Sequence, residues 1–308
     1  MLTRIGRYEV DHLLARGGMG DVYLGRLLAA HGFERPIVIK TIRTELLGDE
    51  RAAMMFIDEA RIAASLHHRN ILQIVDFDRF DEGAFLVTEL VEGCDLNVFL
   101  AYLSAPPPYH LALTIIAELA TGLDAAHEAT AADGTPLNLV HRDVSPSNVL
   151  LGRLGEIKLA DFGIAKTRLR SYHTVSGTIK GKAPYMAPEQ ILGEPLDRRA
   201  DIFSLGVLLF ELTTRTRLFS EKSDAGAMKQ ILAGEIPDPT VRRPGYPPEL
   251  TAIVRRALAR DREARYPTAR ALVDDLDALA RARRWRLSCS AVGELVRVIE
   301  QRAREDAA

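Results

Sequence analysis

From Arg7 to about Val91 the chain shows short apolar runs that alternate with polar residues and are separated by glycine-containing turns. These runs predict β-strands at Tyr8–Val10, Val22–Leu24, Ile37–Ile39 and Ala84–Val87. One helical period interrupts them, because apolar residues recur at spacings of three and four between Met55 and Leu66. The pattern therefore predicts a small sheet that carries one amphipathic helix, from about Asp49 to Leu66.

After Gly93 the apolar period becomes that of helices. The positions that set this period include Leu111, Leu113, Ile115, Ile116, Leu119 and Leu123, and later Leu250, Ile253, Val254 and Leu258. Between them, Ile202–Leu212 is apolar on nearly all sides, which is typical of a helix at the centre of a helical region. The tail after Arg281 predicts an additional helix, whose apolar positions are Leu295, Val296, Val298 and Ile299.

Composition narrows the class of protein and the kinds of partner. Of the 308 residues, 47% are hydrophobic and 27% are charged, which is ordinary for globular proteins and excludes general disorder. Lysine and arginine (40) nearly balance the acidic residues (42), so no overall basic field attracts nucleic acid. The two cysteines, Cys94 and Cys289, form no C-x-x-C motif, which excludes a disulfide framework and a cysteine-ligated zinc site.

Neither the N-terminal residues nor any internal run has the composition of a membrane segment. Met1–Glu9 contains no apolar stretch of the kind that a secretory signal needs. The longest apolar stretch, Gly206–Phe210, is far shorter than the roughly 18 residues that a membrane span requires. The sequence therefore predicts a soluble, cytoplasmic protein without a membrane span.

Glycines within Leu14–Val22 join the first two strand-like runs and would let backbone N–H groups approach a phosphate without a Cβ in the way. A glycine-rich turn without a ligand fits this segment equally well. Lys40 ends the apolar strand, and Glu59 lies on the apolar face of the predicted helix, where an unpaired carboxylate is costly to bury. A Lys40–Glu59 ion pair would satisfy both side chains.

A second group of polar residues occupies His141–Asn148 and Asp161–Gly163. Asp143, Asn148 and Asp161 supply the oxygen ligands that Mg²⁺ prefers, with one carboxylate left over to receive the proton of a hydroxyl. Each short motif alone also fits a turn or a helix cap, but the combination is specific. These residues predict a magnesium site beside a carboxylate that can accept the proton of a hydroxyl.

At these residues the sequence resembles the protein kinase superfamily, and its glycine loop and Ala187–Gln190 look like the bacterial, eukaryotic-like Ser/Thr branch. The resemblance covers about Tyr8–Leu279. It implies the α+β, two-lobed protein kinase fold over residues 8–279, with an N-lobe at about 8–91 and a mainly helical C-lobe at about 92–279. A C-terminal helical extension, residues 280–308, follows this domain.

The resemblance implies a structural role for Glu189, Asp201 and Arg265. Arg265 stands where the family has an arginine that forms a salt bridge with the glutamate of Ala-Pro-Glu, here Glu189. Asp201 belongs to an Asp-x-x-Ser-x-Gly segment. Small-molecule kinases lack both segments, so a protein substrate is favoured over a metabolite.

The resemblance also implies ATP and Mg²⁺ as cofactors and in-line transfer of the γ-phosphoryl group to a Ser or Thr hydroxyl. Lys40, held by Glu59, would bind the α- and β-phosphates, Asn148 and Asp161 would hold Mg²⁺, and Asp143 would meet the substrate hydroxyl.

The nucleotide would lie against the glycine loop, the second strand pair and the segment that joins the two lobes. The residues expected there are Leu14, Ala15, Arg16, Gly17, Gly18, Met19, Gly20, Asp21, Val22, Val38, Lys40, Thr88, Glu89, Val91, Asp95 and Leu150. Thr88 is at the gatekeeper position, Glu89 and Val91 would offer backbone hydrogen bonds to adenine, and Asp95 would meet the ribose.

One departure from the family pattern changes the expected chemistry. Ser145 stands where Ser/Thr kinases carry a lysine that contacts the γ-phosphate, and Lys182 stands where they carry a threonine. We hypothesise that Lys182 returns this ammonium to the γ-phosphate, with Ser145 as its hydroxyl partner. The alternative is a solvated loop lysine. The exchange blurs the residue cue that separates Ser/Thr from Tyr kinases, although Pro146 favours Ser/Thr.

Arg142 precedes the catalytic aspartate, and in the family such an arginine commonly receives a phosphate of the activation segment. Thr174, Ser176 and Thr178 are the candidate autophosphorylation sites, and phosphorylation between copies would require self-association.

Two rival hypotheses remain beside an active protein kinase. The first is a pseudokinase that acts as a nucleotide-binding signalling scaffold, and the second is a small-molecule phosphotransferase.

Overall fold

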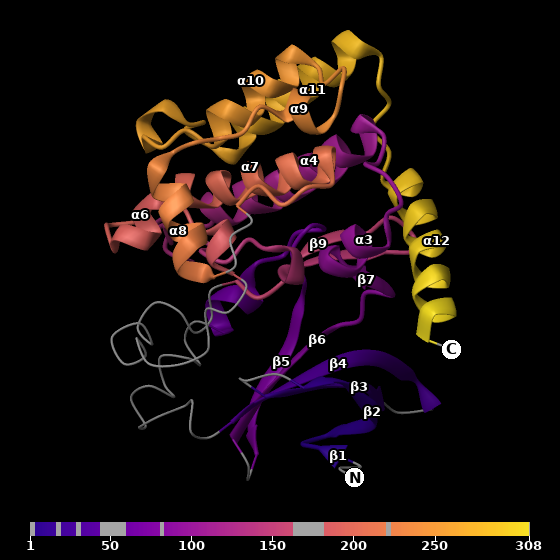
Figure 1. Ribbon diagram of the computed structural model, residues 1–308. Helices are drawn as coiled ribbons and strands as arrows, with labels where there is room; N and C mark the ends of the chain where they lie inside the picture. Colours follow the sequence, from indigo (N-terminus) through magenta and orange to yellow (C-terminus); the bar gives the residue numbers. More distant parts are fainter. Residues whose placement is uncertain are drawn as a thin grey trace. The chain divides into compact units, whose positions relative to one another are not determined.

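A computed structural model describes residues 4–16, 20–28, 32–43, 60–80, 83–162, 182–219 and 223–307 (Figure 1). The described residues divide into two compact units, and each is considered by itself. The sheet unit contains the described residues up to His68 together with Leu72–Val91. The helical unit contains Arg69–Ile71 and the described residues from Glu92 onward.

The sheet unit is built on one six-stranded antiparallel sheet with the strand order β1-β2-β3-β4-β6-β5. Its strands are β1 (Arg4–Ile5), β2 (Tyr8–Arg16), β3 (Asp21–Leu28), β4 (Glu34–Arg43), β5 (Ile74–Phe80) and β6 (Gly83–Glu89). The four predicted strands are confirmed within β2, β3, β4 and β6. The predicted helix is described only at its end, where Ala60–Ser65 is helical, and its residues 49–59 lie outside the described residues.

One face of this sheet forms a small apolar core. Successive side chains of a strand point to opposite faces, so Ile37 and Ile39 of β4 share a face, as do Phe85 and Val87 of β6. All four are almost completely buried, and they pack together with Tyr8. The alternate positions of β4 and β6 therefore lie on the opposite face of the sheet.

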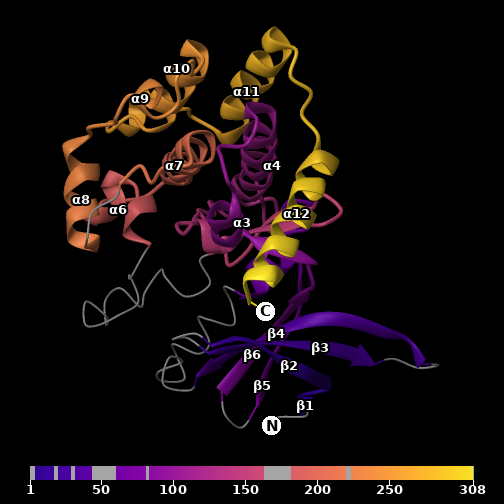
Figure 2. The same cartoon turned by 45° about the vertical axis from the view of Figure 1, so that its right-hand side comes forward.

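The helical unit contains long helices and a small three-stranded antiparallel sheet of order β7-β8-β9 (Figure 2). Its strands are β7 (Gly93–Asp95), β8 (Val149–Gly152) and β9 (Ile157–Leu159). Its α-helices are α3 (Leu96–Tyr102), α4 (Tyr109–His127), α6 (Pro188–Leu192), α7 (Arg199–Thr214), α8 (Asp224–Ala233), α9 (Pro239–Arg242), α10 (Pro248–Ala257), α11 (Ala269–Arg283) and α12 (Cys289–Ala307). Short 3-10 turns are η2 (Pro146–Asn148), η3 (Ala183–Tyr185) and η4 (Arg262–Ala264).

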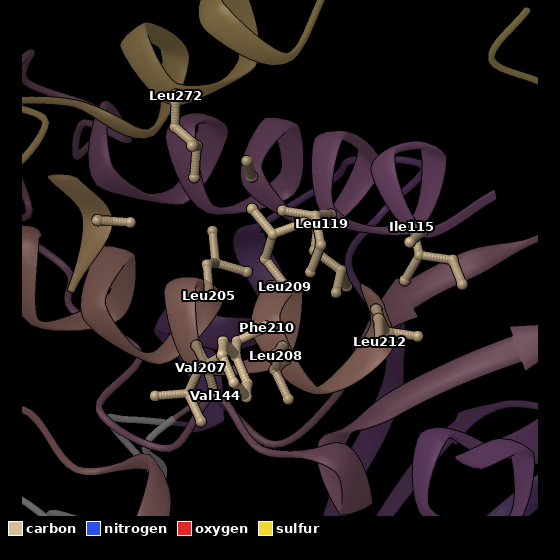
Figure 3. Close-up of a cluster of buried hydrophobic side chains, with 14 of the residues drawn as sticks. Ile115, Leu119, Val144, Leu205, Val207, Leu208, Leu209, Phe210, Leu212 and Leu272 are labelled. Carbon is tan, nitrogen blue, oxygen red and sulfur yellow. The ribbon is translucent and has the colours of Figure 1, made fainter. Parts of the chain in front are cut away.

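Helix α7 lies at the centre of the helical unit, as its apolar sequence predicts. Every residue from Ala200 to Thr214 is buried. Figure 3 shows Leu205 and Leu209 of α7 pointing toward α4, with Leu272 of α11 nearby. Full burial of one leucine side chain contributes about 1.5–3 kcal/mol, so this helix anchors the unit.

Helix α12 packs along α3, α4, β7 and β8, and Figures 1 and 2 both show it beside α3. Val296 and Ile299 are fully buried, as their spacing predicts. Val298 is exposed instead, because it lies roughly 200° around the helix from Val296 and so faces away from the unit. Residues 280–283 continue α11, and the separate tail helix begins at Cys289. Within the described residues, no helix has both the length and the apolar composition to cross a membrane.

Candidate active site

In the sheet unit, strand register brings four predicted site residues to one face. Val22 lies opposite Lys40 in the β3–β4 pair, and Val38 lies opposite Thr88 in the β4–β6 pair. Directly opposed residues share a face, and Val38 and Lys40 are two positions apart on β4. Val22, Val38, Lys40 and Thr88 therefore form a patch on the face opposite the apolar core.

The end of the predicted glycine loop is fixed to β4 immediately beyond Lys40. The Asp21 N–H donates to Thr41 Oγ1 at 2.9 Å, and the Thr41 hydroxyl donates to the Asp21 carbonyl at 3.1 Å. A Cβ on Gly20 would lie 1.8 Å from the Thr41 carbonyl oxygen, so only glycine fits this close backbone approach. Leu14, Ala15 and Arg16 lie at the exposed end of β2.

The segment after β6 begins with Glu89. Its N–H donates to the Gln73 carbonyl at 3.1 Å, and its carboxylate accepts from the Gln73 N–H at 2.8 Å. These bonds tie the end of β6 to the start of β5. The Glu89 N–H is therefore already paired, and Val91 follows two residues later at the end of the sheet unit.

In the helical unit, Asp95 of β7 lies opposite Leu150 of β8. The two side chains therefore share one face of the three-stranded sheet, as a ribose-contacting and an adenine-contacting residue would. Asp95 has a second role that the sequence interpretation missed. Its Oδ1 accepts the Val98 N–H at 2.8 Å and so caps the N-terminus of α3.

The centre of the candidate site is the Asp143 carboxylate, whose side chain is only 10% exposed. The Asn148 amide donates to Asp143 Oδ2 at 2.9 Å and to the Asp143 carbonyl at 2.8 Å. Both amide hydrogens are thus directed at Asp143, which leaves Oδ1 as the Asn148 atom that can ligate a cation. This pair of hydrogen bonds connects Asp143 and Asn148, which lie five residues apart in the sequence, across η2.

Lys182 also contacts Asp143. Its Nζ lies 2.7 Å from Asp143 Oδ2, and its side chain is about one-third exposed, at 34%. Ser145 was predicted to be the hydroxyl partner of Lys182, but no hydrogen bond joins the two side chains within the described residues. Ser145 is buried, and its Oγ lies 3.2 Å from Ser147 Oγ. The ammonium is therefore placed at the carboxylate itself.

The loop that holds Asp143 is anchored by Asp201, which is buried. Asp201 accepts the His141 and Arg142 N–H groups, each at 2.8 Å, and lies 2.8 Å from His127 Nε2. Burial alone would raise the pKa of Asp201, but the hydrogen bond and charge of His127 outweigh it and lower the pKa. Asp201 therefore remains a carboxylate that fixes the loop.

His141 is held as a neutral ring. Burial is the largest effect on it and lowers its pKa. Its Nε2 donates to the Ala160 carbonyl at 3.0 Å, and its Nδ1 accepts the Asp143 N–H at 3.2 Å, which fits the neutral tautomer. Its ring also packs edge-on against Phe162, with centroids 4.5 Å apart. His141 thus connects the Asp143 loop to the Asp161–Phe162 segment.

Two site residues have unusual backbone conformations. Arg142 (φ 66) and Asp161 (φ 56) both lie in the left-handed region, which non-glycine residues rarely adopt. Such conformations cost of order 1–3 kcal/mol and tend to occur at functional sites. The Asp161 side chain is exposed.

The Ala187–Gln190 segment is tied to the rest of the helical unit by two side chains. Arg265 donates to both Glu189 oxygens at 2.7 and 2.9 Å, and both side chains are buried. Gln190 donates to the Arg142 carbonyl at 3.0 Å and accepts the Ala187 N–H at 2.9 Å. This segment therefore supports the catalytic loop directly.

The sequence interpretation missed Tyr185 and Glu211. The Tyr185 hydroxyl donates to Glu211 Oε2 at 2.8 Å, and the Ser204 hydroxyl donates to the Tyr185 carbonyl at 2.7 Å. The only sequence signal was a glutamate within an otherwise apolar helix. These contacts hold η3, which follows Lys182.

Several predicted residues lie outside the described residues. They are Gly17, Gly18 and Met19 of the glycine loop, Glu59, Gly163, and the candidate phosphorylation sites Thr174, Ser176 and Thr178.

The donor set at Asp143 fits a magnesium nucleotide. In the part of the chain that the structure describes, no group of three or more His, Cys, Asp or Glu side chains could hold a metal ion. Mg²⁺ usually keeps several waters and takes only one or two protein carboxylates together with substrate phosphates. Asn148 and Asp161 are sufficient for that mode of binding, whereas they would not suffice for a metal held by protein alone.

Known proteins resemble this chain along almost its whole length. The family model for the protein kinase domain matches residues 8–276. The tyrosine-protein kinase MasK of Myxococcus xanthus is 44% identical over 281 residues, which cover 90% of this chain and 43% of MasK. The serine/threonine-protein kinase PknL of Mycobacterium tuberculosis is 35% identical over 274 residues, which cover 89% of this chain and 66% of PknL. The serine/threonine-protein kinase PrkC of Bacillus subtilis is 32% identical over 273 residues, which cover 88% of this chain and 40% of PrkC.

Among solved structures, the PknI kinase domain of Mycobacterium tuberculosis matches with a TM-score of 0.68 and 27% sequence identity. The match covers 90% of this chain and 98% of that domain. The predicted α+β protein kinase fold is thereby confirmed. The chain spans between 40% and 66% of the lengths of the three curated relatives described above.

Proposed function

The chain belongs to the protein kinase domain family, and on that basis we propose that it transfers the γ-phosphoryl group of ATP to Ser and Thr hydroxyls of protein substrates. The observation that carries this proposal is the environment of Asp143. Its carboxylate is nearly buried, yet Asn148 and Lys182 both donate to one of its oxygens. A carboxylate held in this way has a fixed orientation.

In the proposed reaction, Asp143 orients the acceptor hydroxyl and takes its proton at Oδ1, the oxygen opposite the one that Lys182 and Asn148 contact. Asn148, through Oδ1, and Asp161 would hold Mg²⁺, which would neutralise charge on the phosphate oxygens when Mg²⁺-ATP is bound. Lys40 holds the α- and β-phosphates, and Glu59 is proposed to orient Lys40. Positioning and charge neutralisation supply most of the rate enhancement in this class of reaction.

The adenine and ribose are assigned to surfaces that each unit presents separately. The patch of Val22, Val38 and Thr88 offers an apolar surface for one face of the adenine, and backbone groups of Glu89 and Val91 would bond its edge. Leu150 would cover the other face and Asp95 would meet the ribose. The shared face of Asp95 and Leu150 supports this assignment.

Lys182 is proposed to supply the ammonium that Ser145 cannot. An ammonium 2.7 Å from the carboxylate beside the acceptor hydroxyl is close enough to share its donors with a phosphate oxygen. Three rotatable N–H donors allow one lysine to contact both anions at once. The contact with Asp143 argues against a lysine that is only solvated.

Ser and Thr are proposed as acceptors in preference to Tyr. PknL and PrkC are named serine/threonine kinases, whereas MasK is named a tyrosine kinase. Pro146, which is buried at the start of η2, supports the Ser/Thr assignment. Thr174, Ser176 and Thr178 are proposed as autophosphorylation sites whose phosphate would meet Arg142. One copy of the chain is proposed to phosphorylate another. The proposed location is the cytoplasm, where ATP and Mg²⁺ are supplied.

Intact-mass measurement after incubation with Mg²⁺-ATP tests the proposal, with Asp143→Asn as the control. Phosphopeptide mapping then identifies the acceptor residue type. Phosphate added only to the wild type, and on Ser or Thr, is the expected result. Phosphate on Tyr alone would overturn the acceptor assignment while leaving the protein kinase activity in place.

The departure at Ser145 favours one rival function, a pseudokinase that binds nucleotide as a signalling scaffold. Bound ATP without transfer to the chain itself or to added protein substrates would identify that function. Turnover of a metabolite with none on proteins would identify a small-molecule phosphotransferase instead.

A further inference from the structure

A pocket of about 550 Å³ lies in the helical unit, between α3 and the end of α7. Asn97, Leu100 and Ala101 line it from α3. Glu211 lines it from α7, and Arg215 and Arg217 line it from the residues that follow α7. The volume falls in the range of about 300–1,000 Å³ that is usual for ligand pockets.

The walls of this pocket are attached to the two segments that carry Asp143, Asn148 and Lys182. Helix α3 packs against η2, which ends at Asn148. Glu211 accepts the hydroxyl of Tyr185, the last residue of η3, and Lys182 lies immediately before η3. The pocket is therefore held in a fixed position relative to the transfer site.

The charge of the pocket is positive. Arg215 is exposed and donates one bond, to the Ser104 carbonyl at 3.3 Å, and Arg217 is half-exposed and lies 3.4 Å from Glu211 Oε2. Each guanidinium has five N–H donors, and each makes one side-chain hydrogen bond within the described residues. Burial raises the pKa of Glu211 to about 8, so at neutral pH this carboxyl offsets less than one of the two positive charges.

We propose that this pocket binds an acidic side chain of the protein substrate, through the guanidinium groups of Arg215 and Arg217. The inference rests on the proposed kinase function and adds a substrate class to it: proteins that carry an acidic residue close in sequence to the acceptor hydroxyl. Arg217 is held in place by its ion pair with Glu211 and by the Tyr185 ring beneath its guanidinium.

Positional scanning of acceptor peptides with Mg²⁺-ATP tests the inference on the full chain. The wild type is expected to favour Asp or Glu over Ala at one position beside the acceptor, by roughly tenfold in kcat/KM. Arg215→Glu should abolish that preference and favour Lys there, and Arg217→Gln should weaken it. Arg281→Gln, an exposed arginine of α11, is the matched control and should leave the profile unchanged.

Peptide affinity, measured by fluorescence anisotropy on the same proteins, separates this inference from the proposed function. Binding that keeps the acidic preference without any phosphate transfer would overturn the kinase assignment and support the pocket. Transfer with no acidic preference, or with a preference that Arg215→Glu leaves intact, would overturn the pocket. Arg215 is exposed, so its variant is expected to fold, and circular dichroism verifies that for each variant.

Discussion

Single residues in this protein combine a structural contact with a chemical role. Lys182 is the clearest example, because its ammonium lies 2.7 Å from the carboxylate that is proposed to receive the acceptor proton. Asn148 contacts the same oxygen through its amide. In the proposed site, Asn148 would offer its oxygen to a cation while its amide hydrogens hold Asp143, so that metal binding and carboxylate orientation would depend on the same residue.

Glu211 shows how burial makes one residue sensitive to pH. Burial raises its pKa from an ordinary value of 4.5 to about 8. Between these values the folded protein binds more protons than the unfolded chain, so the free energy of unfolding should fall as pH rises through this window. Each pKa unit corresponds to about 1.4 kcal/mol, which urea unfolding measures easily.

We predict that Glu211→Gln flattens the dependence of unfolding free energy on pH between about 5 and 8, because Gln cannot titrate. Gln can still bond Tyr185 and the Leu218 N–H, which lies 3.2 Å from Glu211 Oε1. Glu249→Gln is the control, since a hydrogen bond from Arg283 lowers the pKa of Glu249 and moves its titration below this window. An unchanged slope in Glu211→Gln would contradict the prediction.

At the scale of elements, α6 and η3 depend on buried polar anchors more than on apolar burial. Arg265 uses all five of its N–H donors: two on Glu189 and one each on the carbonyls of Ala259, Arg199 and Arg260. A buried carboxylate that loses its partner is strongly destabilising. The short helix α6 is therefore fixed by an arginine that lies far along the chain.

We predict that Arg265→Ala lowers the free energy of unfolding by about 3–5 kcal/mol, because it strands the buried Glu189 carboxylate. Arg270→Ala breaks the exposed Arg270–Asp274 pair on α11 and should cost no more than about 0.5 kcal/mol. Urea unfolding of both variants measures the difference. Equal losses of unfolding free energy in the two variants would contradict the prediction, because they would show that the buried pair stabilises the protein no more than the exposed pair does.

Elements that rest on local patterns were predictable from the sequence, and contacts between distant segments were not. Strand alternation located β2, β3, β4 and β6, and apolar periodicity located α7. The contact of Lys182 with Asp143 was not predictable in its actual form, because spacing along the chain does not tell which of two nearby anions an ammonium will meet. The pocket beside Glu211 is lined by residues of α3 and of the end of α7, which lie far apart along the chain, and the sequence held no signal that they meet there.

At the scale of the whole molecule, α12 is an integral part of the helical unit. Arg153, in the turn between β8 and β9, donates to both Glu300 oxygens at 2.5 and 3.0 Å. Gly293 lies so close to the same turn that a Cβ there would approach Gly155 N to 2.6 Å and Arg153 O to 2.7 Å. The helix thus supports the hairpin that carries Leu150.

We predict that Gly293→Ala destabilises the protein by about 1–3 kcal/mol, as an overpacked contact does. In an unconstrained helix the same change would stabilise it by about 0.5–1 kcal/mol, so the sign is diagnostic. Val298→Ala, at an exposed position of α12, should change stability by less than about 0.5 kcal/mol. Thermal unfolding provides the measurement, and a stabilised Gly293→Ala variant would contradict the observed packing.

Steady-state kinetics of Lys182→Ala beside Lys180→Ala would decide whether the ammonium at Asp143 takes part in phosphoryl transfer. We expect Lys182→Ala to lower kcat about a hundredfold or more, as loss of a donor aimed at developing charge does. Lys180→Ala should change kcat little, and Ser145→Lys combined with Lys182→Thr should recover part of the loss. Equal and small effects of the two alanine variants would contradict a catalytic role for Lys182.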